Sequence, residues 1–170
     1  GQIWTSKKNL LSKAVSCWAD GQAALESDAM TAVRPYVLVY RNTPAGWMCV
    51  EVGERSFYSK WWGWADARSS VGRPLDKFPG GPEFAQIMMV PFNEVESTKG
   101  MRLDQVVTRM PREQGGPLQP IAFQRLLLGS HLPDGSFALV VVVDRPDEIT
   151  INGLDQSWLS EMPEDVFVEF

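Results

Sequence analysis

Histidine is almost absent from this sequence, which has only His131 among its 170 residues. A single histidine excludes the zinc-protease helix motif, which needs two. The chain also lacks a Walker phosphate loop, a dinucleotide-binding glycine fingerprint and the Gly-x-Ser-x-Gly nucleophile elbow. The sequence therefore shows no recognisable catalytic constellation. We predict a protein that is not an enzyme, with no catalytic residue, no metal site and no cofactor.

Cysteine is scarce as well. The two cysteines, Cys17 and Cys49, form neither a disulfide framework nor a pair spaced like zinc ligands. Cys17 lies in a helical pattern and Cys49 in a strand pattern, each among apolar neighbours, so we predict buried free thiols. A single disulfide between them is the alternative. Free thiols favour a reducing compartment such as the cytoplasm, although the sequence leaves the localisation open.

Long apolar runs and a basic excess are also missing. The longest apolar run is Phe137–Val143, far short of the ~20 residues that a membrane-spanning helix needs. The net charge is −5, whereas nucleic-acid binders usually carry a basic surface, so we predict no nucleic-acid partner. Residues 113–170 hold 2 basic and 10 acidic side chains. That acidic third indicates either a solvated surface or a face for a basic partner or a second copy.

What is present fits an ordinary globular protein. Apolar residues make up 44% of the chain and charged residues 22%, and 170 residues are enough for one domain with a sizeable core. We therefore predict a single globular domain, residues 1–170. Its longest strand-like run, 137–143, is apolar at every position, which indicates a central strand that is buried on both faces.

The remaining pattern predicts an α+β fold with a largely antiparallel sheet of about five or six strands and two to four helices. Helical spacing is clearest at Leu103, Val106, Val107 and Met110. A helix at 6–20 begins at the N-cap Ser6 and stops at Gly21. The other predicted elements are a short helix at 22–33, a hairpin at 36–52 that 57–58 extend, loops at 66–83 and 111–120, strands at 87–92, 149–151 and 166–170, an ambiguous segment at 121–128, a turn at 133–136 and a helix at 154–162.

Tryptophan is the most unusual residue type, with seven in the chain. Trp61, Trp62 and Trp64 crowd one short stretch beside Lys60. Exposed tryptophan favours protein contacts, because the ring is apolar and has one polar edge. We therefore predict a non-catalytic protein–protein interaction or assembly module that contacts a partner, or a second copy, through Trp61, Trp62, Trp64 and Lys60. Core packing of most of these rings is the alternative, with at least one of the three pointing outward.

Two further interpretations remain open. Gly1 is followed by Gln2, Ile3, Trp4 and Thr5, which fits N-myristoylation at Gly1. Lys7, Lys8 and Lys13, on the polar face of the first predicted helix, would supply the basic second signal of a matrix-like peripheral membrane protein. Alternatively, a small-molecule or sugar binder, or an unfamiliar enzyme, would use the tryptophans as a platform and His131, Asp144 or Asp147 as polar groups. That last interpretation requires these regions to meet in the fold.

Overall fold

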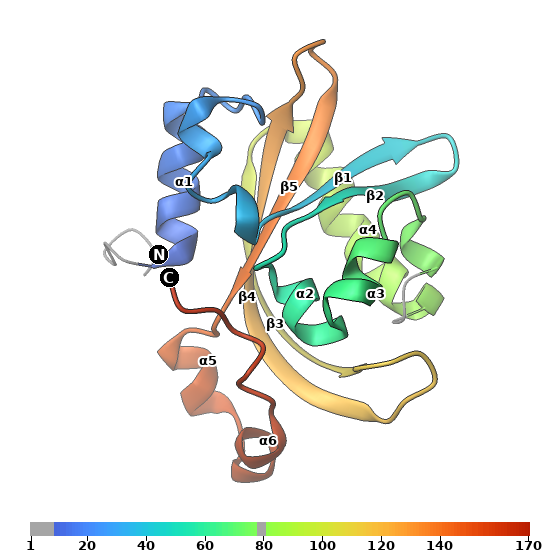
Figure 1. Ribbon diagram of the computed structural model, residues 1–170. Helices are drawn as coiled ribbons and strands as arrows, with labels where there is room; N and C mark the ends of the chain where they lie inside the picture. Colours follow the sequence, from blue (N-terminus) through green and yellow to red (C-terminus); the bar gives the residue numbers. More distant parts are fainter. Residues whose placement is uncertain (1–8, 78–80) are drawn as a thin grey trace.

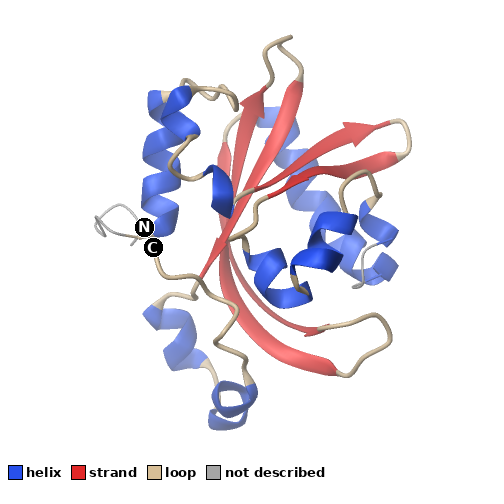
Figure 2. Cartoon of the chain, viewed as in Figure 1, coloured by secondary structure: helices blue, strands red, loops and turns tan. Residues whose placement is uncertain are grey.

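A five-stranded antiparallel sheet runs through the computed structural model, which describes residues 9–77 and 81–170. The strand order is β2-β1-β5-β4-β3, so the last strand of the sequence lies in the middle (Figures 1 and 2). The fold is therefore α+β, as predicted. The strands are β1 (Leu38–Thr43), β2 (Gly46–Val52), β3 (Met101–Pro111), β4 (Leu118–His131) and β5 (Phe137–Asp144).

Helices cover both faces of the sheet (Figure 1). One face carries α1 (Leu10–Asp20), and the opposite face carries α2, α3 and α4. Two short helices, α5 and α6, follow β5 and lie beyond the end of the sheet at which β5 finishes. The bounds are α2 Phe57–Trp62, α3 Trp64–Ser69, α4 Gly81–Thr98, α5 Glu148–Gly153 and α6 Gln156–Glu161.

Strand β5 confirms the prediction of a doubly buried central strand. Its side chains alternate between the two faces, since successive residues of a strand point in opposite directions. Leu139 and Val141 join the core beneath α2–α4, whereas Val140 and Val142 join the core beneath α1. Both cores are fully apolar at these positions, with side chains at most 1% exposed. The uninterrupted apolar run is thus explained by helices on both sides.

Helix α1 begins later than the sequence suggested. Its N-cap is Asn9, whose Oδ1 accepts hydrogen bonds from the amides of Leu11 at 2.7 Å and Ser12 at 3.2 Å. Such a cap satisfies amides that have no partner within the helix. The predicted N-cap Ser6 lies outside the described residues. The predicted stop at Gly21 is confirmed, since Gly21 is the C-cap.

Two predictions of element type were wrong: one predicted strand is a helix, and one predicted helix is a strand. Segment 87–92, predicted as a strand, lies inside α4, with the buried Pro91 within the helix. Segment 103–110, predicted as a helix, lies inside β3, which pairs with β4 along its whole length, from Met101 with Leu128 to Pro111 with Leu118. The spacing of four apolar residues suited a helix, but sheet pairing decided the structure, because local propensity yields to tertiary contacts.

Smaller elements also differ from the predictions. Residues 57–58 begin α2 instead of extending the sheet, 149–151 lie in α5, and 166–170 form no strand. Within 22–33, turns and a 3₁₀ helix at Asp28–Met30 replace the predicted helix, and α3 occupies part of the predicted loop 66–83. The hairpin within 36–52, the turn at 133–136 and the short helix within 154–162 are confirmed. The predicted loop 111–120 is shorter, since it covers only 112–117, and 121–128 belong to β4.

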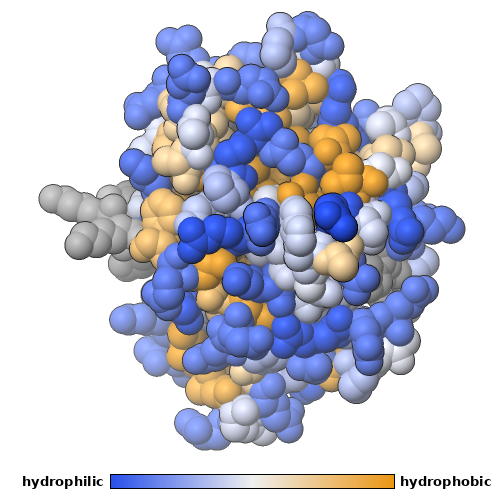
Figure 3. Space-filling view, viewed as in Figure 1, coloured by the Kyte–Doolittle hydropathy of each residue, from blue (hydrophilic) through white to orange (hydrophobic). Residues whose placement is uncertain are grey.

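In the described part of the chain, no helix is both long and apolar enough to cross a bilayer. On the face drawn in Figure 3, hydrophobic side chains form separate patches between hydrophilic ones.

Non-glycine residues with left-handed backbone lie near one end of the sheet. Within residues 9–77 and 81–170, the non-glycine residues with positive φ are Gln22 at 55°, Ala23 at 64° and Lys99 at 59°. The amide of His131, at the end of β4, donates to the carbonyl of Ala23 at 2.9 Å. Lys99 is held against the same strand, since the amide of Gly129 donates to the carbonyl of Gly100 at 2.7 Å. These contacts fix a conformation that L-residues disfavour.

We expect Ala23→Gly to stabilise the protein by about 0.5–1 kcal/mol, because glycine adopts positive φ without the steric penalty of a Cβ atom. The matched control is Ala19→Gly in the exposed surface of α1, which should cost about 1 kcal/mol, since glycine weakens a helix. Urea unfolding of both variants measures the two changes. A loss of stability in Ala23→Gly as large as that in Ala19→Gly would contradict this account.

Candidate functional site

A charged residue lies inside the core between the sheet and α2–α4. Arg125, on β4, is only 4% exposed. It lies on the same face of the sheet as Phe123 and Leu127, which belong to the core beneath α2–α4. The side chain of Met88, on the inner face of α4, contacts Arg125 directly. A buried arginine must be compensated by charge and by hydrogen bonds, so its partners define this site.

One carboxylate neutralises Arg125. Asp104, its cross-strand neighbour on β3, accepts from Nη2 through Oδ2 at 3.0 Å. The other oxygen of Asp104 accepts from Arg102 Nε at 2.8 Å, and Arg102 also contacts Glu94 of α4. The result is a chain of alternating charges, Glu94–Arg102–Asp104–Arg125, that runs from the surface into the core. Charge is balanced along this chain.

The hydrogen bonds of Arg125 are incomplete, although its charge is neutralised. The Nε atom of Arg125 has no partner, and Nη1 faces the thioether sulfur of Met88 at 2.6 Å, which is a weak acceptor. The indole Nε1 of Trp62, which is 6% exposed and belongs to the same core, also has no partner. A buried donor without an acceptor is costly and needs an explanation. The site therefore lacks acceptors, not negative charge.

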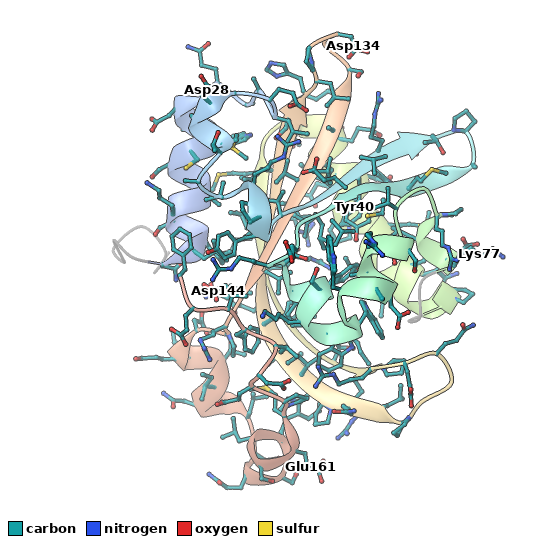
Figure 4. All side chains as sticks on the ribbon, viewed as in Figure 1. Asp28, Tyr40, Lys77, Asp134, Asp144 and Glu161 are labelled. Carbon is teal, nitrogen blue, oxygen red and sulfur yellow. The ribbon has the colours of Figure 1, made fainter. Side chains whose placement is uncertain are left out.

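Three weakly acidic side chains complete the interior. Tyr40 is on β1, and its side chain lies between the sheet and the α2–α4 layer (Figure 4). Its hydroxyl interacts with that of Tyr58 on α2. Burial raises the pKa values of both phenols, and the nearby Arg125 opposes the rise. Burial also raises the pKa of the Cys49 thiol to about 12. All three groups are therefore protonated at neutral pH.

The predicted tryptophan surface is only partly present. Trp61 and Trp62 are 1% and 6% exposed, so their rings pack in the core beneath the sheet. Trp61 donates its Nε1 proton to the carbonyl of Pro111 at 2.9 Å. Trp64 is 38% exposed and Lys60 is exposed, which leaves these two side chains at the surface. As predicted, at least one of the three rings points outward.

His131, Asp144 and Asp147 are not brought together with the tryptophans. His131 pairs with Phe137 at the beginning of β5, whereas Asp144 is the last residue of that strand. Figure 4 shows this separation, with Asp134 in the turn at one end of β5 and Asp144 at the other. Asp147 caps α5 by accepting from the amide of Thr150 at 2.7 Å. The interpretation that needs these regions to meet, as a small-molecule or sugar binder or an unfamiliar enzyme, therefore loses its support.

Asp144 has a local role of its own. Its Oδ1 accepts from the amide of Arg145 at 2.8 Å, and its carboxylate also meets the amide of Leu10 at the start of α1. Burial raises the pKa of Asp144, and these two amides oppose the rise. Gly1, the predicted acylation site, lies outside the described residues, as do Lys7 and Lys8.

Sequence reasoning overlooked the interior site, although one signal pointed to it. The segment 121–128 reads Ile-Ala-Phe-Gln-Arg-Leu-Leu-Leu, which places Gln124 and Arg125 in an otherwise apolar run. On a strand, neighbouring residues point to opposite faces, so one of the two has to be buried on each side. Gln124 is fully paired there, since it accepts from Gln105 and donates to the carbonyl of Arg145. Arg125 is not.

Comparison with known proteins adds no family. No protein-family model and no curated protein matches the chain. Among solved structures, it is similar to the LOV domain of the blue-light photoreceptor Aureochrome1 in its light state, with 13% identity, a TM-score of 0.44, and coverage of 80% of this chain and 97% of that one. The dark-state structure gives the same identity and TM-score, with coverage of 92% and 94%. Similarity at this level carries no functional argument.

We expect the charges of the interior site to respond asymmetrically to substitution. Asp104→Ala should cost about 3 kcal/mol or more, because it leaves the buried Arg125 charge without a carboxylate. Arg125→Met should cost less than about 1.5 kcal/mol, because Asp104 keeps Arg102 and the core gains an apolar side chain. The double variant should recover most of the loss. Urea unfolding tests the cycle, and an Asp104→Ala loss no larger than that of Arg125→Met would refute it.

The two thiols give a second prediction. Both cysteines are buried and free, and burial raises the pKa of each. The thiolate is the reactive form of cysteine, so the folded protein should react with a thiol reagent at pH 8 far more slowly than the urea-unfolded chain. In the unfolded chain, both thiols should react immediately. Stability should fall as the pH rises past about 8.5, where thiols ionise in the unfolded chain first. Rapid reaction in the folded state would contradict the burial of Cys17 and Cys49.

Proposed function

We propose that this protein binds a small, flat and largely apolar molecule through a carbonyl-type oxygen, in the interior site between the sheet and α4. The observation that supports the proposal is Arg125, which is almost fully buried, charge-neutralised by Asp104 and short of acceptors. A ligand oxygen near Nε of Arg125 would supply the acceptor that is missing. Nε1 of Trp62 is a second donor in the same core.

The chemistry of the surroundings favours a neutral ligand. Asp104 already compensates the charge of Arg125, so a second buried carboxylate would be repelled and would require its own counter-charge. Aromatic rings line the same core: Phe92 lies 5.0 Å from Tyr40 and 5.4 Å from Trp47 between ring centroids. A flat molecule can pack among such rings in stacked or edge-on arrangements. The proposed ligand is therefore neutral, aromatic and an oxygen acceptor.

The Met88 side chain would block access to Arg125 when no ligand is bound. Its side chain is 4% exposed and occupies the position next to Nη1 of Arg125. Methionine is unbranched and changes rotamer readily, so a ligand can displace it at modest cost. Binding would thus move a residue of α4, and occupancy of the interior would be felt along that helix.

A non-catalytic role is part of the proposal. The interior thiol of Cys49 has a pKa of about 12 and remains a poor nucleophile at neutral pH. The potential acid or base His131 lies at the end of β4, seven residues along the strand from Gln124, which pairs with Asp144. The groups that a reaction would require are therefore not gathered at one place in the described residues.

Binding of acetophenone, a neutral aromatic ketone, tests the proposal against ethylbenzene, which has a similar shape but no acceptor. We expect acetophenone to raise the urea midpoint of the protein, by mass action on the folded state, and ethylbenzene to have a smaller effect. Met88→Ala should strengthen acetophenone binding by opening space, whereas Arg125→Met should remove the preference for the ketone. Met89→Ala, on the outer side of α4 with Met89 42% exposed, is the matched control and should leave the response to both compounds unchanged. Equal effects of the two compounds on the wild-type protein would refute the proposal.

Contact with a second copy through α4 is a second candidate function, and the outer face of that helix favours it. Ile87 and Val90 are 59% and 71% exposed, and Met89 lies beside them. These three residues carry no charge, so two copies can meet there without repulsion. Exposed apolar groups in one patch are typical of contact surfaces. Sedimentation equilibrium should show self-association that Val90→Ser weakens, and a monomer at all accessible concentrations would exclude this contact.

A further inference from the structure

A second cluster of polar groups lies where β4 ends, well away from Asp144. Two depressions meet at this place, with volumes of about 310 Å³ and 370 Å³, and both are lined by His131 and Gly135. The first is also lined by Ala23, Lys99, Gly129, Ser130 and Phe137. We call the residues around the first depression the His131 corner. It shares no residue with the interior site.

The backbone of the His131 corner is held in an unfavourable conformation. Ala23 and Lys99 line the depression, and both have positive φ, as does Gln22 beside Ala23. A Cβ atom at Gly129 would lie 2.9 Å from the carbonyl carbon of Lys99, so glycine is needed for this close approach. Strain of this kind persists where surrounding contacts over-determine it, and it is frequent at binding sites. Here it brings Lys99 next to the end of β4.

Lys99 and His131 are the groups available to a ligand. The ammonium of Lys99 lies 4.5 Å above the centroid of the Phe137 ring. None of the ion pairs among the described residues includes Lys99, and no carboxylate lines the first depression. The backbone of His131 is engaged by Ala23 and Leu25, and the Ser130 hydroxyl donates to the carbonyl of Leu128. The imidazole and the ammonium therefore remain as donors.

We propose that the His131 corner binds a small monocarboxylate. The Lys99 ammonium and an imidazole N–H of His131 offer a donor to each of the two carboxylate oxygens, and the positive charge of Lys99 matches a single negative one. A phosphate dianion would carry more negative charge than Lys99 compensates, and Glu26 lines the adjoining depression. Alanine and glycine at positions 23, 129 and 135 leave room for a short apolar tail. A volume near 310 Å³ corresponds to about ten water molecules, enough for such a ligand.

Because His131 is the only histidine, its imidazole C–H signals in a proton NMR spectrum report on this corner without isotope labelling. The probe is sodium propionate, titrated at pH 7.5 and at constant ionic strength, with propionamide as the neutral isostere. We expect the His131 signals to shift and saturate with propionate, with a Kd of about 1–10 mM, typical of one or two exposed charge-assisted contacts. Propionamide should give no saturating shift.

Variants distinguish the proposed contact from a general effect of salt. Lys99→Gln should weaken propionate binding about fivefold or more, the loss of one charge-assisted hydrogen bond, whereas Lys99→Arg should retain it. The same substitution at the exposed Lys60, Lys60→Gln, should leave it unchanged. Circular dichroism confirms that each variant is folded. Equal shifts with propionamide, full binding by Lys99→Gln, or tighter saturation with inorganic phosphate would overturn the proposal.

Discussion

Every other part of this structure is arranged around β5, which is paired on both edges and buried on both faces. Its neighbours are β1 and β4, and its side chains enter two separate cores. A strand that is apolar on both sides cannot face water, so helices must cover the sheet twice. This requirement explains α1 on one side and α2–α4 on the other. It also explains why a polar side chain on the adjacent strand β4 becomes buried.

Arg125 is the conspicuous exception to this apolar sheet. Replacing a buried ion pair by apolar residues is often neutral or stabilising, so stability alone gives little reason to keep an arginine there. Its guanidinium is held by Asp104 and covered by Met88 of α4. The same helix carries Ile87 and Val90 on its outer side. One helix therefore separates the unsatisfied interior from an apolar surface, and displacement of its inner side chain would shift both.

The sequence predicted the features that depend on strong local patterns. The apolar run 137–143, the hairpin within 36–52 and the turn at 133–136 were correctly identified, because pattern and tertiary structure agree there. Prediction from the sequence failed where the spacing of apolar residues fitted more than one type of element. Four apolar residues in 103–110 fit a helix, yet β3 forms because β4 provides a partner for its whole length. The candidate site was overlooked because burial of Arg125 depends on the packing of α4. The sequence did not predict this helix, since the segment 87–92 resembles a strand. Only contacts between distant segments determine these outcomes.

The pairing of β1 with β5 also has a consequence for how the chain folds. Leu38 pairs with Val141, so β1 cannot pair with β5 until about 100 further residues have been synthesised. Contacts so distant in sequence slow folding, because a large loop has to be ordered first. During synthesis on the ribosome, the apolar faces of β1 and α1 would remain uncovered. The nascent protein is then an expected client of chaperones that hold exposed apolar segments until β5 emerges.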